Sequence, residues 1–311
     1  MRGEGLANTD HMRIFLTGGT GYIGTAVLDG FVRAGHHVDA LVRNSEKAAE
    51  VQRRGATPVL GDAGEPGSYA DAAAAADGVV LTAFDSSPRG VGVDATTLDT
   101  VLATPGAPGR FIIYTSGVWV LGPAASPADE TAPLHPIELV AWRPAHEQRV
   151  LDAATAGWRP VVIRPGIVYG RNRGIVGDLL KDASNSLIRV IGGGDNHWAL
   201  VYDRDLADLY VRTAAGVGAS GVYHANDEGD ETVNDIVAAL SDHARTRPSV
   251  RRVPLAEARK KLGVYAEALA LDQIVRSPRA HALGWHPTLH SVAGNAARLF
   301  EEWRRGQTEK P

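Results

Sequence analysis

Apolar and polar residues follow one another along the first half of the chain in a pattern that predicts strands separated by helices. Short apolar runs, which are typical of buried strands, cover residues 12–16, 37–42, 57–60, 78–84, 110–116 and 158–164. Between them, residues 25–32, 71–76 and 92–103 have the composition of helices. Strands that alternate with helices at this spacing predict an α/β fold with a doubly wound parallel sheet and right-handed crossovers.

The second half of the chain has a less regular pattern. Residues 221–224 predict a returning strand, and Thr232 opens a helix through residue 244 with a sequence resembling a capping box. Residues 289–305 predict an amphipathic helix with Leu299, Phe300 and Trp303 on one side. No internal repeat or low-complexity linker divides the chain.

The feature around which the first half is organised is the turn Thr17-Gly18-Gly19-Thr20-Gly21-Tyr22-Ile23-Gly24. It joins a predicted buried strand to an amphipathic helix, as in a dinucleotide-binding βα unit. Gly18 allows a backbone angle that closes the turn, Gly21 leaves space for a pyrophosphate, and Gly24 lets the helix approach the strand. The N–H groups at the start of the helix then face the phosphates, so the turn predicts a nucleotide cofactor.

The end of the second predicted strand indicates which dinucleotide binds. An acidic residue that binds the adenosine ribose of NAD is expected about where Val42 stands, eighteen residues past Gly24. The chain continues instead with Arg43, Asn44 and Ser45. A guanidinium with nearby donors favours a 2′-phosphate, which predicts NADP(H). The alternative is that Arg43 is a solvated surface residue and that Ser45 caps the next helix.

Composition narrows the function classes further. A net charge of −4 and a pI near 6.3 give no electrostatic case for a nucleic-acid or anionic-membrane partner. The absence of cysteine excludes disulfides and thiolate chemistry, and no apolar run approaches the length of a membrane span. We therefore expect a cytoplasmic protein. His286 and His290 have the spacing of a helical metal pair, but Pro287 and the missing third ligand argue against a metal site.

With these motifs in hand, the chain resembles the extended branch of the short-chain dehydrogenase/reductase superfamily. The resemblance covers nearly everything after His11 and rests on residues 17–24, 61–62, 114–117, 164–170, 198–206 and 283–287. It implies the strand order 3-2-1-4-5-6-7, a smaller C-terminal substrate lobe, and a homodimer through the helices around residues 92–103 and 147–156. The implied organisation is a loose extension at 1–11, an NADP-binding Rossmann domain at 12–165 with a returning strand near 221–226, and a mainly substrate-binding lobe at 166–311.

The resemblance also implies which residues surround the cofactor. Besides Arg43, Asn44 and Ser45, the candidates are Gly18, Thr20, Gly21, Tyr22, Ile23, Gly24, Asp62, Ala63, Thr82, Ala83, Phe84, Thr115, Ser116, Arg143, Pro165, Gly166 and Val168. For Asp62 two interpretations stand side by side: its carboxylate accepts from the adenine amino group, or it caps the turn that follows the strand.

The catalytic residues of the superfamily are not in place. Hydride-transferring members use a Tyr-x-x-x-Lys pair, in which the ammonium lowers the pKa of the phenol. None of the eight tyrosines has a lysine four residues later, and the aligned positions hold Leu139 and Arg143. Ser116 stands one residue earlier than the usual serine. The chain therefore resembles the atypical members, which keep the nucleotide fold without the standard proton-transfer residues.

These observations predict an enzyme, an NADP(H)-dependent oxidoreductase acting on a small or medium-sized carbonyl, imine or alkene. Its candidate catalytic residues are Ser116, Arg143, Tyr169 and Tyr202, with Arg143 orienting the ribose or polarising the substrate oxygen. For Tyr202, core packing is the favoured alternative. Two other functions stay open: a redox-inactive NADP-binding sensor or scaffold, and a nucleotide-sugar epimerase or dehydratase.

Overall fold

The structure is a computed structural model that describes residues 11–216 and 218–308, and every structural statement refers to these residues. Apart from His11, the expected N-terminal extension lies outside them. The strands are β1 (Arg13–Thr17), β2 (His37–Val42), β3 (Thr57–Leu60), β4 (Gly78–Leu81), β5 (Phe111–Thr115), β6 (Ala124–Ala128), β7 (Arg159–Pro165), β8 (Ile167–Tyr169), β9 (Leu187–Ile191), β10 (Leu200–Tyr202), β11 (Gly221–Ala225), β12 (Ser249–Val253) and β13 (Gln273–Val275). The α-helices are α1 (Tyr22–Arg33), α2 (Ser45–Arg53), α3 (Ala70–Ala74), α4 (Gly90–Leu102), α5 (Arg143–Asp152), α6 (Gly174–Ser184), α7 (Asp203–Ala215), α8 (Val233–His243), α9 (Leu255–Leu262), α10 (Tyr265–Leu269), α11 (Pro278–Ala282) and α12 (Ala296–Thr308).

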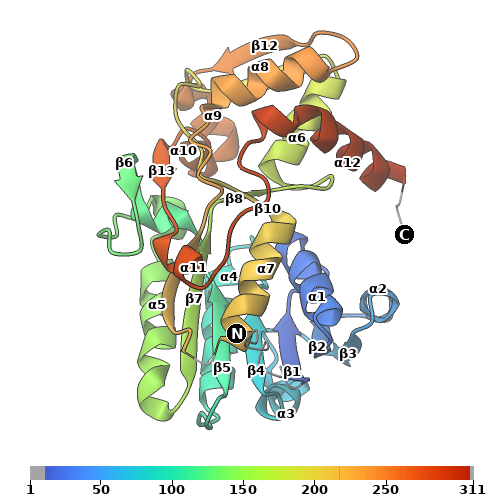
Figure 1. Cartoon of the computed structure of the whole chain (residues 1–311), viewed down its shortest axis with the longest axis vertical. Helices are drawn as coiled ribbons and strands as arrows, with labels where there is room; N and C mark the ends of the chain where they lie inside the picture. Colours follow the sequence, from blue (N-terminus) through green and yellow to red (C-terminus); the bar gives the residue numbers. More distant parts are fainter. Residues whose placement is uncertain (1–10, 217, 309–311) are drawn as a thin grey trace, which may run out of the picture. The chain divides into compact units, whose positions relative to one another are not determined.

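Seven strands form the sheet that the sequence predicts (Figure 1). Their order is β11-β7-β5-β4-β1-β2-β3, so β7 and β11 are the sixth and seventh strands of the expected order. β1 pairs in parallel with β2 and β4, and β4 pairs in parallel with β5. Ile14, Phe15 and Leu16 in β1 are fully buried, as a strand covered on both faces requires. The predicted α/β fold class is confirmed.

The chain forms two compact units that alternate along the sequence. Of the described residues, unit 1 contains 11–115, 146–162, 207–216 and 218–221, and unit 2 contains 116–145, 163–206 and 222–308. The sequence prediction instead assigns 12–165 to one domain and 166–311 mainly to the other. In the structure the chain enters unit 2 already at Ser116, and strand β7 leaves unit 1 after Val162.

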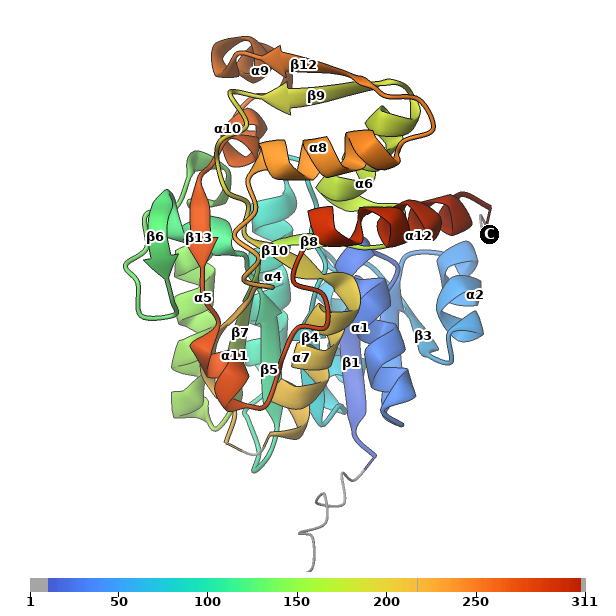
Figure 2. The ribbon, with the colours of Figure 1, turned by 45° about the horizontal axis from the view of Figure 1, so that its top comes forward.

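Unit 2 has a hydrophobic core of its own. Tyr169, Tyr202 and Phe300 are among its fully buried side chains. Figure 2 shows the helix α8 beside the two-stranded parallel sheet of β9 and β12. The predicted capping box at the start of α8 is confirmed, because the Thr232 side chain accepts from the Asp235 N–H and the Asp235 carboxylate accepts from the Thr232 N–H.

One local prediction is wrong. The C-terminal helix begins at Ala296 instead of near residue 289, because the Glu231 carboxylate accepts from the N–H groups of Val292 and Ala293 and holds that segment in an irregular path. In the alternative interpretation of Arg43, Ser45 caps this helix; the cap of α2 is Asn44, because the Asn44 side chain accepts from the Lys47 N–H. In the described part of the chain, no helix has both the length and the apolar character needed to cross a bilayer.

Candidate functional site

The glycine turn between β1 and α1 has the tight backbone geometry that the sequence predicts. Gly18 has a φ of +75°, and a Cβ atom there would lie 2.7 Å from the Ala83 nitrogen. A Cβ atom on Gly24 would lie 2.0 Å from the Gly18 carbonyl oxygen. Each of these two positions therefore requires glycine, as predicted for the turn closure and for the approach of helix to strand.

The N-cap of α1 is a glycine, which has no side chain to cap the helix. Gly21 occupies the N-cap in an extended conformation, offers no side-chain hydrogen bond, and is followed by no acidic residue in the first turn. Helix N–H groups and the helix dipole at such an end attract an anion. The Thr25 hydroxyl fixes the turn by donating to the Gly21 carbonyl at 2.7 Å. The contacts predicted for Thr20, Tyr22 and Ile23 in this turn stay predictions.

The end of β4 packs against the turn. The Thr82 hydroxyl donates to the Thr17 carbonyl at 2.7 Å, and the Ala83 N–H donates to the Thr17 hydroxyl at 3.3 Å. Phe84 follows with 60% of its surface exposed. Small residues thus line the turn, and a large apolar ring stands next to it in solvent, where a flat ligand would cover it.

The end of β2 carries a cation without an ionic partner. Arg43 is exposed and forms no ion pair with the described residues. The Asn44 side-chain oxygen is used in capping α2, and Ser45 is exposed in the first turn of that helix. The guanidinium of Arg43 can therefore approach an added phosphate without first breaking an existing ion pair.

The residues after β3 have local structural contacts. The Asp62 carboxylate accepts from the Gly64 N–H at 2.8 Å, as the turn-capping interpretation requires. The Ala63 carbonyl accepts from the Tyr69 hydroxyl at 3.1 Å and from the Thr97 hydroxyl at 3.3 Å. These bonds fix the backbone of the loop, and the adenine contact of Asp62 stays a prediction.

In unit 2, Ser116 has a buried hydroxyl for which the described residues provide no hydrogen-bond partner. Its N–H donates to the Ile163 carbonyl at 2.8 Å, which continues the sheet pairing one residue beyond β5. A buried hydroxyl without a partner is unfavourable unless a ligand or water completes it. Thr115, the preceding candidate, ends the first segment of unit 1 and shares a 2.6 Å hydrogen bond with the Tyr210 hydroxyl of the same unit.

The helix that would carry the standard catalytic pair begins too late in the chain. α5 starts at Arg143 with Pro144 in its first turn, as proline at a helix start allows. Leu139, which aligns with the missing tyrosine, lies in a separate 3-10 turn at Glu138–Val140. The Arg143 guanidinium stacks over the Trp142 ring at 4.5 Å from its centre. The two aligned positions therefore do not share one helical face.

The segment after β7 is fixed by backbone contacts within unit 2. The Gly166 N–H donates to the Ala225 carbonyl at 2.9 Å, and a Cβ atom on Gly166 would lie 2.6 Å from the Ala199 carbonyl oxygen. Val168 pairs with Val201 between β8 and β10. The candidates Pro165, Gly166 and Val168 therefore lie on rigid backbone, and their predicted cofactor contacts stay predictions.

Tyr169 and Tyr202 are core residues of unit 2. Their rings lie 5.7 Å apart, the Tyr169 hydroxyl donates to the Leu289 carbonyl, and the Tyr202 hydroxyl donates to Glu302 at 2.9 Å. Burial raises the pKa of both phenols, that of Tyr202 to about 12 with Glu302 adding to the rise. A raised pKa makes a phenol a poorer acid, so these surroundings favour packing over proton donation.

The structure also contains a buried carboxylate cluster that the sequence did not indicate. Asp205 accepts from Thr288 and Leu289, and Glu231 accepts from Ser291, Val292 and Ala293. Burial raises the pKa of the neighbouring Asp227 to about 7, and the charges of Glu231 and Asp205 contribute to the rise. The Asp205 carboxylate braces a segment more than eighty residues further along the chain.

A second contact network joins three elements of unit 1. The Asp94 carboxylate on α4 accepts from the Tyr114 hydroxyl at 2.9 Å and pairs with His146 of α5 at 2.6 Å. Because the partners of Asp94 lie 20 and 52 residues away, no local pattern could have indicated them.

Within the part of the chain that the structure describes, no three metal-ligating side chains gather as a metal site would need, and the His290 ring is hydrogen-bonded to the Asp227 carbonyl.

Comparison with known proteins supports a nucleotide-binding assignment. Residues 18–168 match the model of an NAD(P)H-binding family. An uncharacterized protein, C2A9.02, of Schizosaccharomyces pombe is 31% identical over 90% of this chain and 96% of its own. The 4-hydroxy-2-methyl-3-oxo-4-farnesyl-3,4-dihydroquinoline-1-oxide ketoreductase of Stigmatella aurantiaca is 27% identical over 80% of this chain and 78% of its own.

Two solved structures have the same fold. The human epimerase family protein SDR39U1 (isoform 2), crystallised with NADPH, gives a TM-score of 0.74 at 22% identity and covers 93% of this chain and 99% of its own. The Thermus thermophilus UDP-glucose 4-epimerase in complex with NAD gives a TM-score of 0.77 at 19% identity and covers 94% and 99%. A nicotinamide dinucleotide is thus common to both neighbours, while its 2′-phosphate is not.

Proposed function

Because the chain belongs to the atypical, extended branch of the short-chain dehydrogenase/reductase superfamily, we propose that it is an NADP(H)-dependent oxidoreductase that reduces a small or medium-sized carbonyl compound. An imine or a polarised alkene is an equivalent hydride acceptor. The observation that carries the proposal is the glycine turn, where Cβ atoms at Gly18 and Gly24 would fill the space that the backbone needs. The start of α1, whose N-cap Gly21 has no side chain, would supply N–H donors and the positive end of the helix dipole to a pyrophosphate.

The preference for NADP(H) rests on Arg43. Its exposed guanidinium stands at the carboxyl end of β2, where the adenosine ribose binds in a sheet of this order. It forms no ion pair with the described residues, and no acidic residue occupies the end of β2 to repel a 2′-phosphate. The reductase assignment draws support from the Stigmatella aurantiaca relative, which is named as a ketoreductase.

The reduction requires a hydride at the carbonyl carbon and a proton at the carbonyl oxygen. NADPH, when bound, supplies the hydride. Ser116 has a buried hydroxyl without a protein partner among the described residues, and it would donate to the substrate oxygen as negative charge develops there. Arg143 would orient the ribose or polarise the same oxygen. The proton comes from water, because the raised pKa values of Tyr169 and Tyr202 disfavour transfer from either phenol.

The cofactor preference is tested by titrating NADPH and NADH into the wild type and into Arg43→Ala. Losing the guanidinium should weaken NADPH binding about tenfold or more, since a hydrogen bond to a charged group contributes about 1.5–3 kcal/mol. NADH binding should change less than about twofold. Arg53→Ala is the matched control, because Arg53 is exposed near the opposite end of α2 and forms no ion pair with the described residues. Equal losses for both dinucleotides would remove the NADP(H) assignment.

Turnover is tested with NADPH deuterated at C4 and a panel of ketones, aldehydes and β-keto acids. Deuterium in the product alcohol supports the proposal, and Ser116→Ala should then lower kcat while leaving NADPH affinity unchanged. A second candidate, a redox-inactive NADP-binding protein, is favoured by the position of Leu139 outside α5. Tight binding of both oxidised and reduced cofactor without deuterium transfer to any substrate would support that candidate instead.

A further inference from the structure

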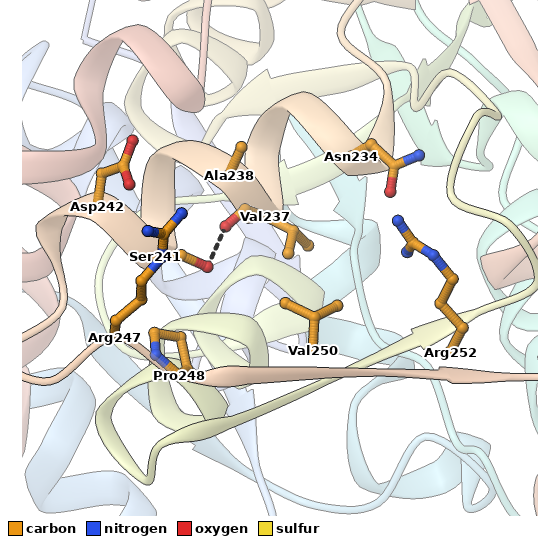
Figure 3. Close-up of a pocket in the computed structure, with 9 residues that line it drawn as sticks. All are labelled: Asn234, Val237, Ala238, Ser241, Asp242, Arg247, Pro248, Val250 and Arg252. Atoms are coloured by element: carbon orange, nitrogen blue, oxygen red, sulfur yellow. Dashed lines mark hydrogen bonds between the residues drawn. The ribbon is translucent and has the colours of Figure 1, made fainter.

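Unit 2 contains a groove that no predicted cofactor residue lines. It has a volume of about 670 Å³ and lies between α8 and β12. Figure 3 shows the side chains around it, with α8 on one side and β12 on the other. Pockets of about 300–1,000 Å³ accommodate small organic ligands, so the groove is large enough for one.

The two walls of the groove follow from the periods of their elements. On β12 and the residue before it, Pro248, Val250 and Arg252 alternate with residues that point to the other face. On α8, Asn234, Val237, Ala238, Ser241 and Asp242 recur at helical spacing. Val237, Ala238, Pro248 and Val250 form an apolar middle, and Val250 is 42% exposed.

The polar groups are placed at the two ends of this apolar middle. Arg252 extends toward Asn234 at one end, and Arg247 extends toward Asp242 at the other (Figure 3). Neither arginine forms an ion pair with the residues that the structure describes. At the Arg252 end the Asp195 carboxylate accepts from the Asn234 amide at 2.8 Å but does not line the groove, whereas at the Arg247 end Asp242 lines the groove and offsets part of the positive charge.

The charge of the surrounding segment reinforces this asymmetry. Residues 245–261 contain seven arginines and lysines and one carboxylate, although the whole chain has a net charge of −4. That carboxylate, Glu257, pairs with Arg251 on the opposite face of β12, and Arg259 pairs with Glu267. The positive charge that faces the groove is therefore not neutralised by its own segment.

We propose that the groove between α8 and β12 is a second binding site, which takes an organic anion with an apolar body. The anionic group binds Arg252, the hydrocarbon covers Val237 and Val250, and a neutral polar terminus lies between Arg247 and Asp242. A carboxylate or sulfonate fits the guanidinium, and a short aliphatic or aromatic body fits the apolar middle.

The experiment uses 8-anilinonaphthalene-1-sulfonate, an aromatic anion whose fluorescence rises on binding to apolar sites. Arg252→Ala should weaken binding about tenfold and Arg247→Ala only about two- to threefold, because Asp242 already offsets the charge of Arg247. Arg251→Ala, one residue along β12 on the other face, is the matched control and should leave the affinity unchanged. Ala238→Phe, on the exposed face of α8, should fill the groove and abolish this binding while every guanidinium stays.

A competition arm separates the anionic group from the hydrocarbon. Octanoate should displace the fluorescent probe at a concentration about tenfold below that of octan-1-ol, which has the same chain without the charge. Equal displacement by the two compounds would overturn the anion site. Equal losses for Arg251→Ala and Arg252→Ala, or unchanged binding in Ala238→Phe, would show that the probe responds to diffuse surface charge or binds elsewhere, and either result overturns the proposal.

Discussion

The glycine turn of unit 1 and the segment 288–293 of unit 2 are both irregular backbone paths, but different forces hold them. The turn at Gly18 and Gly24 keeps its shape because side chains are absent where the backbone approaches itself. The segment 288–293 keeps its shape because two buried carboxylates, Asp205 and Glu231, accept from its N–H and hydroxyl groups. The turn therefore depends on glycines at fixed positions within one short segment. The segment 288–293 depends on hydrogen-bond acceptors from distant parts of the chain.

This difference bears on what each region can do. The start of α1 presents N–H groups that no side chain of its N-cap satisfies, so it retains the capacity to bind an anion. In the segment 288–293 the corresponding groups are satisfied within the protein, so that region contributes stability instead. Substitutions should therefore separate the two regions: changes in the turn should alter ligand affinity, and changes in the carboxylate cluster should alter unfolding.

The largest effect is expected from Gly24→Ala. The new Cβ atom would lie 2.0 Å from the Gly18 carbonyl oxygen and 2.6 Å from the Thr82 hydroxyl, so the turn must open. Several charge-assisted hydrogen bonds to a pyrophosphate would be lost together, which should weaken NADPH binding about 100-fold or more. Calorimetric titration measures the affinity, and circular dichroism reports whether the fold is kept.

The control for this prediction is Gly92→Ala in α4, where an added Cβ atom would meet nothing within 4 Å. Because Gly92 lies in the first turn of α4, alanine there should stabilise the fold by at most about 0.5–1 kcal/mol and leave cofactor affinity unchanged. If Gly24→Ala bound NADPH as tightly as Gly92→Ala, the turn would not be the phosphate site.

The same contrast explains how much the sequence could predict. The alternation of strands and helices and the roles of Gly18 and Gly24 depend on local patterns, which one segment carries by itself. The order of the seven strands was implied by the family resemblance. The start of α12 could not be predicted, because the N–H groups of Val292 and Ala293 donate to the Glu231 carboxylate, which lies about sixty residues earlier in the chain. The hydrogen bonds of Asp94 and the buried surroundings of Asp227 could not be predicted for the same reason, because the residues that form them are distant in sequence and meet only in the folded chain. The catalytic candidates were drawn from aligned positions, and the structure brings Tyr169 and Tyr202 together only as core residues.

An intermediate effect is expected from Glu231→Ala. Its removal leaves the N–H groups of Val292 and Ala293 without their acceptor in the core of unit 2, and each unsatisfied buried group costs about 1–3 kcal/mol. The free energy of unfolding in urea should fall by about 3 kcal/mol. Glu301→Ala is the control, because the Glu301–Arg305 pair on α12 is exposed and should contribute less than about 0.5 kcal/mol. Comparable losses of unfolding free energy in both variants would contradict the prediction, because Glu231 would then stabilise the fold no more than an exposed carboxylate does.

The smallest effect, and the one that depends on pH, is expected from Asp227→Asn. Burial, with the charges of Glu231 and Asp205, raises the pKa of Asp227 from 3.8 to about 7 in the folded protein, so the folded state binds this proton more tightly than the unfolded chain does. Its contribution is therefore most favourable below pH 4 and is lost as the pH rises through about 7. Asparagine is neutral at every pH and keeps an oxygen for the Gly229 N–H, which donates to the Asp227 carboxylate at 3.1 Å. Thermal unfolding of the variant should match the wild type near pH 3.5, should exceed it increasingly as the pH rises, and should exceed it by a few degrees at pH 8. A variant less stable than the wild type at pH 8 would contradict this prediction, because it would show that the charged carboxylate of Asp227 is itself stabilising.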